Sequence, residues 1–152
     1  MIEQMIRGLR ELLAGRAELT GVRFVTEYPG LRLEGPLRTP TVCIGLDGAQ
    51  IADAGIGRLI GPGALGCRAE LTAGMGFYMP FSGDVQQLYR ILSCVTDILL
   101  FDSAYALSGM QCGGLRADRN TGAFVMHVSF TFQVDFVRGN SDEGVISGGA
   151  AV

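Results

Sequence analysis

The sequence predicts an α+β domain in which an N-terminal helix and one main helix pack against a mostly antiparallel, twisted sheet. Two long stretches alternate between apolar and other residues, and two further stretches repeat their apolar residues at helical spacing. The order is helix, two strands, arm, long strand, helix and hairpin, with too few helices for a doubly wound parallel sheet. We therefore expect one domain over residues 1–138, with a Gly-rich arm at about 47–66 and a flexible tail over 139–152.

The first helix is predicted over residues 2–13, with Gly15 at the position where helices commonly stop. Its apolar residues share one stripe, and they are Ile2, Met5, Ile6, Leu9, Leu12 and Leu13. We expect this stripe to cover one face of the sheet, and docking on a partner subunit is the alternative. Two strands are expected next, in "TGVRFVTEY" and "TVCIGL", on either side of a proline-bearing stretch.

The arm is expected to be a long glycine-rich loop between two strands. It lacks the lysine of a phosphate-binding loop, and the spacing of Gly55, Gly57 and Gly61 misses the dinucleotide pattern by one residue. A segment that orders against a neighbour fits this composition better. The candidate contact residues in the arm are Ile51, Ile56, Arg58, Leu59, Ile60 and Leu65.

A second long strand is predicted over residues 67–80, where Cys67, Ala69, Leu71, Ala73, Met75 and Phe77 share one side. The main helix follows and extends to about Phe101, with Asp84 and Gln87 spaced as in a capping box. A third strand is expected over residues 103–116, and "DRNTGA" is predicted to form the turn of a closing hairpin.

The last strand, over residues 124–137, has the strictest alternation in the chain. Large apolar residues occupy every second position, and the positions between them hold His127, Ser129, Thr131, Gln133 and Asp135. At about 3.4 Å per residue this strand would be roughly 45 Å long, more than a domain of this size needs for its own core. We expect the polar face around His127, Ser129, Thr131 and Gln133 to contact a subunit or partner.

Composition excludes several classes of function. Apolar residues make up 48% of the 152 residues, yet no apolar run has the length of a membrane helix, so protein contacts are the expected use of the surplus apolar surface. The N-terminus lacks the features of a secretory signal. All twelve basic residues are arginine, without a basic stripe, and the net charge is −3, which disfavours tight nucleic-acid binding. Arginine without lysine suits interface ion pairs or reflects codon usage, and the sequence leaves both explanations open.

Catalytic and metal-binding patterns are also missing from the sequence. The cysteines at 43, 67, 94 and 112 match no zinc spacing and are expected to be reduced and mostly buried. His127 is the only histidine, and Asp135 lies about 27 Å farther along the strand, so a Ser-His-Asp triad would need an acid from elsewhere. A tight turn near Asn120 and Thr121 would place Cys112 opposite Ser129 or Phe130, and only the first register puts it on the face of His127, as a dyad requires. We expect no catalytic site, metal or cofactor.

The order of these features resembles that of the tail-terminator and tail-completion proteins of long-tailed bacteriophages and of phage-derived particles such as tailocins. The resemblance covers residues 1–138 and lies in "MIEQMIRGLRELL", "LRTPTVCIGL", the long strand, "MPFSGDVQQLYRILSCVTDIL" and "HVSFTFQVDF". It is a likeness of layout, since this family has no diagnostic motif. The fold implied is the α+β sheet already expected from the pattern.

The function implied by this resemblance is structural. Such proteins are not enzymes; they form rings, generally hexameric, that cap the tail tube, end its growth and provide the surface to which a neck or head attaches. The partners implied are other copies of the chain and the tube protein, with sheath and neck proteins beyond them, in the tail of a particle made in the bacterial cytoplasm. The alternatives are a head-tail connector, tube or baseplate component, and a small enzyme or ligand-binding domain using His127 and Cys112.

Overall fold

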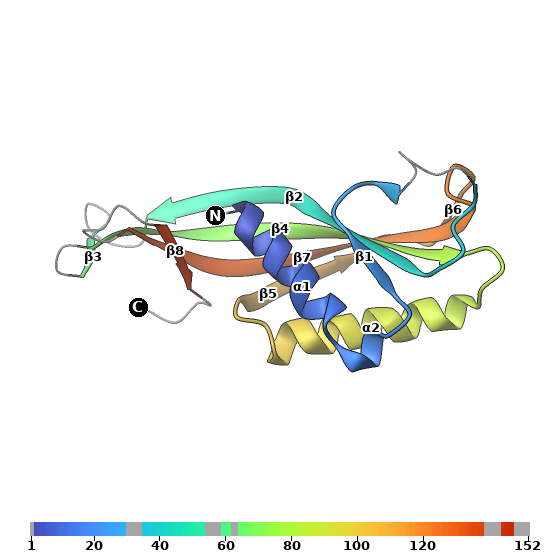
Figure 1. Cartoon of the computed structure of the whole chain (residues 1–152). Helices are drawn as coiled ribbons and strands as arrows, with labels where there is room; N and C mark the ends of the chain where they lie inside the picture. The colour runs from blue at the N-terminus through green and yellow to red at the C-terminus, as the bar shows by residue number, and fades with distance from the viewer. Residues whose placement is uncertain (1, 30–34, 54–58, 62–63, 139–143, 148–152) are drawn as a thin grey trace.

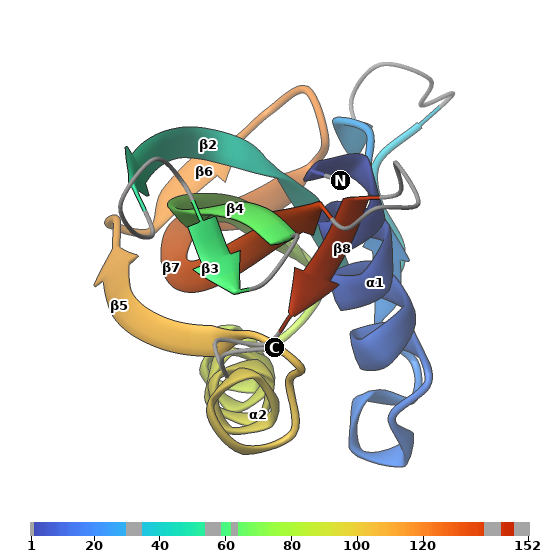
Figure 2. The same ribbon diagram turned by 90° about the vertical axis from the view of Figure 1, so that its left-hand side faces the viewer.

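Two helices cover one side of a long, curved sheet. The computed structural model describes residues 2–29, 35–53, 59–61, 64–138 and 144–147. Both helices, α1 (Ile2–Ala14) and α2 (Val85–Phe101), lie on the same side of the sheet, as the end-on view shows (Figure 2). The predicted α+β class, with an N-terminal and a central helix packed on a mostly antiparallel sheet, is confirmed. Neither described helix is long and apolar enough to cross a membrane.

The main path of the sheet follows the order β1-β2-β4-β7-β5. The strands are β1 (Arg23–Val25), β2 (Thr41–Asp53), β3 (Leu59–Gly61), β4 (Ala64–Pro80), β5 (Ala106–Cys112), β6 (Arg116–Asp118), β7 (Ala123–Arg138) and β8 (Gly144–Ser147). Among the described strands, β1 and β2 are the one parallel pair, while β3 adds to β4 and both β6 and β8 add to β7. In Figure 1, β2, β4 and β7 run side by side past the helices toward β3 and β8.

The core lies between the helices and one face of β4 and β7. On β4, the predicted apolar side is buried from Ala69 to Phe77, and on β7, Phe130 and Phe132 are fully buried. Burying a phenylalanine of this kind contributes about 1.5–3 kcal/mol by transfer from water alone. Both alternating stretches therefore fold as the sequence predicted, because a period of two places the large apolar residues at alternate positions on the helix side.

Each helix contributes an apolar stripe to this core, and its ends follow the sequence signals. Met5 and Leu9 of α1 are buried with residues of the sheet, so the predicted covering role is confirmed. At the start of α2, the Asp84 carboxylate accepts a hydrogen bond of 2.9 Å from the Gln86 amide, and this bond satisfies one of the free helix N–H groups. The helix ends at Phe101, as predicted.

The largest difference from the prediction concerns the arm. Residues 47–53 continue β2, residues 59–61 form β3 and residues 64–66 begin β4, so the expected long loop is wrong over these ranges. Gly48 pairs with Thr72, and the pairing continues to Asp53, which faces Cys67. Backbone pairing along β4 therefore outweighs the low strand propensity of glycine and alanine in this segment.

Three smaller differences concern other parts of the chain. The expected strand in "TGVRFVTEY" is limited to β1, and the expected third strand is divided into β5 and β6. In the region for which the sequence predicted a flexible tail, residues 144–147 form β8, paired with β7 through Phe136 and Ile146 among others. Residues 139–143 and 148–152 of that tail lie outside the described residues.

Candidate functional site: the helix-free face

The side of the sheet turned away from the helices, here called the helix-free face, is organised in rows that cross the strands. Directly paired residues place their side chains on the same side of a sheet. One row joins Gly45 of β2, Gly74 of β4 and Ser129 of β7. Its neighbour joins Gly76 to His127. The polar face predicted for β7 is therefore continued across β4 and β2.

A β-bulge places an acidic residue at the centre of this face. The pairing of β2 with β4 shifts between Leu46 and Gly48, and Asp47 is the residue between them. The Asp47 side chain reaches across β4 to β7, where its Oδ2 lies 2.7 Å from Nε2 of His127. The same oxygen accepts a hydrogen bond of 2.8 Å from Oγ of Ser129. Two positions predicted as contact residues are thus joined to an acid that sequence reasoning did not place there.

Gly74 makes this crossing possible. An ideal Cβ built at position 74 would overlap the carboxylate of Asp47, so any side chain there would displace it. The sequence contains a weak signal for this feature, since Gly74 and Gly76 occupy positions on the polar side of an alternating strand. Glycine weakens a strand interior and often marks the close approach of another group.

The pKa of the Asp47 carboxyl reflects two opposing effects. Partial burial raises this pKa and is the largest single contribution, but hydrogen bonds from His127 and Ser129, together with the charge on His127, lower it below its ordinary value. The side chains of His127 and Asp47 remain 49% and 34% exposed. Solvent therefore screens the pair, and its contribution to stability is that of a surface interaction.

This cluster does not have the connectivity of a catalytic relay. In a serine hydrolase the hydroxyl bonds one imidazole nitrogen and the carboxylate bonds the other. Here, Ser129 donates to Asp47 directly, and the carboxylate holds Nε2 of His127. Asp135, the acid weighed for a triad in the sequence analysis, instead forms an ion pair of 3.0 Å with Nε of Arg68.

In the remaining rows of the helix-free face, polar side chains of neighbouring strands form pairs. Thr72 and Thr131 lie 3.2 Å apart at their hydroxyl oxygens. In the next row, Nε2 of Gln133 donates to Oε2 of Glu70 at 3.0 Å. We call the set of these pairs, from Asp47 with His127 to Arg68 with Asp135, the polar ladder. All four predicted residues of β7, namely His127, Ser129, Thr131 and Gln133, belong to it.

The proposed dyad of Cys112 and His127 is not assembled. Cys112 pairs with Val128, whose side chain is buried on the helix side, whereas His127 points to the opposite side. The predicted register is wrong because the pairing with β7 shifts by one residue between β6, where Arg116 faces Val125, and β5, where Cys112 faces Val128. Cys112 is also exposed, so the expectation of a mostly buried thiol is wrong for this cysteine, whereas the other three cysteines are partly buried.

The arm residues differ in how far the structure describes them. Ile51 is 66% exposed, although its partner on β4, Ala69, is buried, with only 1% of its surface exposed. Both residues belong to the helix side of the sheet, where β2 continues past the helices (Figure 1). Ile56 and Arg58 lie outside the described residues, while Leu59 and Ile60 are described as backbone of β3 and Leu65 as backbone of β4.

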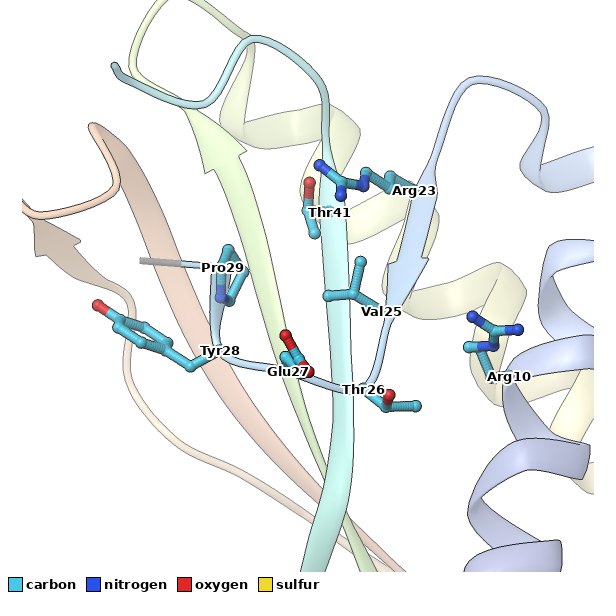
Figure 3. Close-up of a pocket in the computed structure, with 8 residues that line it drawn as sticks. All are labelled: Arg10, Arg23, Val25, Thr26, Glu27, Tyr28, Pro29 and Thr41. Atoms are coloured by element: carbon cyan, nitrogen blue, oxygen red, sulfur yellow. The ribbon is translucent and has the colours of Figure 1, made fainter. Parts of the chain in front are cut away.

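Two hollows border the segment that follows β1. The first, of about 300 Å³, is lined by β1 and the segment that follows it, by Thr41 of β2 and by Arg10 of α1, as Figure 3 shows. The second, of about 320 Å³, lies at the β6 end of the helix-free face, and we call it the end pocket. It is lined by Tyr28, Gly76, Tyr78, Arg116, Ala117, Asp118, Val125 and His127.

Within the described ranges, no group of three or more histidine, cysteine or acidic side chains is placed to hold a metal ion. Comparisons of the sequence with protein-family models and with curated proteins find no match. The arrangement of the chain's own residues is therefore the basis for the functional proposal that follows.

Proposed function

We propose that this chain is a ring-forming structural protein that caps the tail tube of a phage or phage-like particle, ends tube growth and presents the surface to which a neck or head attaches. The order of elements supports this proposal, because it keeps the layout that resembles the tail-terminator proteins. In this proposal the partners are further copies of the chain and the tube protein, and the assembly surfaces are the extended strands.

The observation that carries the proposal is the apolar surface on the part of β2 beyond the helices. Ile51 is 66% exposed and Leu46 is 43% exposed, although the apolar residues of β4 on the same side are buried. A free subunit would leave these side chains in water, at a cost of about 25 cal/mol per Å² of apolar surface. A neighbouring subunit in a closed ring would cover them, and each subunit would present the same surface in turn.

The polar ladder supports a second part of the proposal, a surface that passes DNA without retaining it. Three carboxylates, those of Asp47, Glu70 and Asp135, lie along it with the single guanidinium of Arg68. Arg68 is already paired with Asp135, and DNA binding depends on cations that are free to neutralise phosphates. We therefore assign the part of the helix-free face that carries the polar ladder to the lumen of the ring.

Native mass spectrometry across protein concentrations, with negative-stain images of the same samples, tests the ring. The expected result is closed oligomers, with six subunits as the leading stoichiometry. Ile51→Asp should shift the population to monomers without unfolding the chain, because Ile51 is largely exposed in the free subunit. Arg90→Glu, a charge change on the exposed surface of α2, is the matched control and should leave the rings intact.

Monomers that persist at high concentration and with tube protein added would contradict the proposal. Antibody labelling of intact particles then separates the tail terminator from the other structural assignments. Label at the head-proximal end of the tube supports the terminator, whereas label along the tube or on the baseplate would assign the chain to those components.

A further inference from the structure

The end pocket is formed by paired strands of the sheet, and it is large enough for a small ligand. Tyr78, Val125 and Arg116 form one row across β4, β7 and β6, so their side chains share the helix-free face. Gly76 adds no side chain to the lining, and an ideal Cβ there would approach Tyr78 to 2.9 Å. The volume of about 320 Å³ lies at the lower end of the range for ligand pockets, roughly 300–1,000 Å³.

Two tyrosine rings give the pocket flat apolar walls. The ring centroids of Tyr28 and Tyr78 lie 6.3 Å apart with an interplanar angle of 55°. The Tyr28 hydroxyl donates a hydrogen bond of 2.9 Å to Asp118, which fixes the orientation of that ring. Burial raises the pKa of Tyr78 to about 12, so its ring carries a neutral hydroxyl at ordinary pH.

The charged groups around the pocket are not equally available to a ligand. Asp118 already accepts hydrogen bonds from the Tyr28 hydroxyl, the Thr121 hydroxyl and the Asn120 amide. Nε2 of His127 is held by Asp47. Arg116, in contrast, is exposed and makes no ion pair or hydrogen bond within the described part of the chain. A guanidinium with free donors is suited to grip a carboxylate through two parallel hydrogen bonds.

The carboxylates near the end pocket limit the kind of anion that it can bind. Asp118 lines the pocket and Asp47 lies on the far side of His127, so both would repel a doubly charged phosphate more than a singly charged carboxylate. The tyrosine walls favour a flat or apolar body next to the charge. From these features, we propose that the end pocket binds a carboxylate carried on a flat, apolar group, with Arg116 on the charge and Tyr28 and Tyr78 on the body. The proposal does not depend on the ring assignment.

The single histidine of the chain provides a direct probe, because His127 lines the pocket and the Hε1 proton of its imidazole gives one signal in the NMR spectrum. Benzoate titrated at constant ionic strength should shift this signal saturably, with a Kd on the order of 1–10 mM for so small a ligand. Benzamide has nearly the same shape without the charge, and it should cause no saturable shift.

Variants assign the binding to the pocket. Arg116→Gln should weaken benzoate binding at least tenfold, and an unchanged imidazole signal before titration shows that the variant is folded. Arg23→Gln removes a guanidinium from the neighbouring hollow and should bind benzoate as the wild type does. Equal binding of benzamide, equal binding by Arg116→Gln, or no shift up to about 100 mM benzoate would each overturn the proposal.

A dilution series separates a free small molecule from another source of carboxylate, an acidic side chain of a second copy of the chain, which lacks the flat apolar body and would overturn that part of the proposal. If the source is a second copy, the imidazole signal moves with protein concentration alone, and benzoate reverses the movement. If the source is a small molecule, the signal is independent of protein concentration and responds only to benzoate.

Discussion

The two sides of β7 differ in how their residues are stabilised. On the helix side, Phe130 and Phe132 are fully buried, and their contribution comes from the area removed from water. On the helix-free side, Ser129 and Gln133 remain partly accessible and form specific hydrogen bonds to neighbouring strands. The first side depends on volume and apolarity, whereas the second depends on which residues lie opposite one another. Mutations should therefore have large effects on one side and small, pair-specific effects on the other.

The largest effect is expected on the helix side. Phe130→Ala removes a fully buried ring from the core and should lower the free energy of unfolding by about 3–5 kcal/mol. Gln133→Ala, on the other side of the same strand, should cost less than about 1 kcal/mol. Urea denaturation of both variants measures the difference, and similar losses for the two would contradict the distinction between the sides.

The next effect concerns the crossing of Asp47 over β4. Gly74→Ala places a methyl group where the carboxylate lies, which breaks the hydrogen bonds to His127 and Ser129, and it should cost about 1–3 kcal/mol. Gly45→Ala lies in the same row with open space around it and should change stability by no more than about 0.5 kcal/mol.

A double-mutant cycle shows whether the carboxylate is the cause. In an Asp47→Ala background, Gly74→Ala has no carboxylate to displace, so most of its cost should disappear. An undiminished cost in that background would mean that the methyl group disturbs the sheet itself and that the crossing contributes little.

The ionisation of Asp47 should give a smaller effect that depends on pH. The pKa of Asp47 is lower in the folded state than in the unfolded state. The ionised carboxylate therefore stabilises the fold above the unfolded pKa of about 3.9, and this stabilisation is lost as the pH falls through the folded pKa. Asp47→Asn should cost less than about 1 kcal/mol at pH 5, because the pair is partly exposed, and the gap to wild type should narrow toward pH 2.5. If the stability difference between wild type and Asp47→Asn instead widens as the pH falls, folding raises the pKa of Asp47 rather than lowering it.

The smallest effect is expected within the polar ladder. Thr131→Val keeps the shape of the side chain and removes the contact with Thr72, so stability should stay within about 0.5 kcal/mol of wild type. Thermal denaturation is sufficient to test this. A loss above about 1.5 kcal/mol would show that the ladder acts as one cooperative network.

The same contrast explains which features could be predicted from the sequence. The helix side follows from local periodicity, so the burial of Phe130 and the start of α2 at Asp84 could be predicted without a structure. The contact between Asp47 and His127 spans 80 residues and depends on a bulge, which no local pattern reveals. The register of Cys112 is a related case, since a one-residue shift in the pairing with β7 between β6 and β5 changes the side on which Cys112 lies.

The extension of β2 shows a different limit. Gly48, Ala49 and Gln50 have low strand propensity, and by themselves they indicate a loop. Their strand conformation depends on β4, which supplies partners along the whole segment. The composition of the arm predicts Ile51 as a contact residue, and the structure adds that its side chain is 66% exposed.

The measurement that tests this account most directly is hydrogen–deuterium exchange at low and high protein concentration. If the extension of β2 is the assembly surface, protection of residues 46–53 should increase with concentration, in step with the oligomers seen by native mass spectrometry, while α2 stays unchanged. Oligomers that form with unchanged exchange over residues 46–53, or exchange that is independent of concentration in the presence of tube protein, would contradict the account.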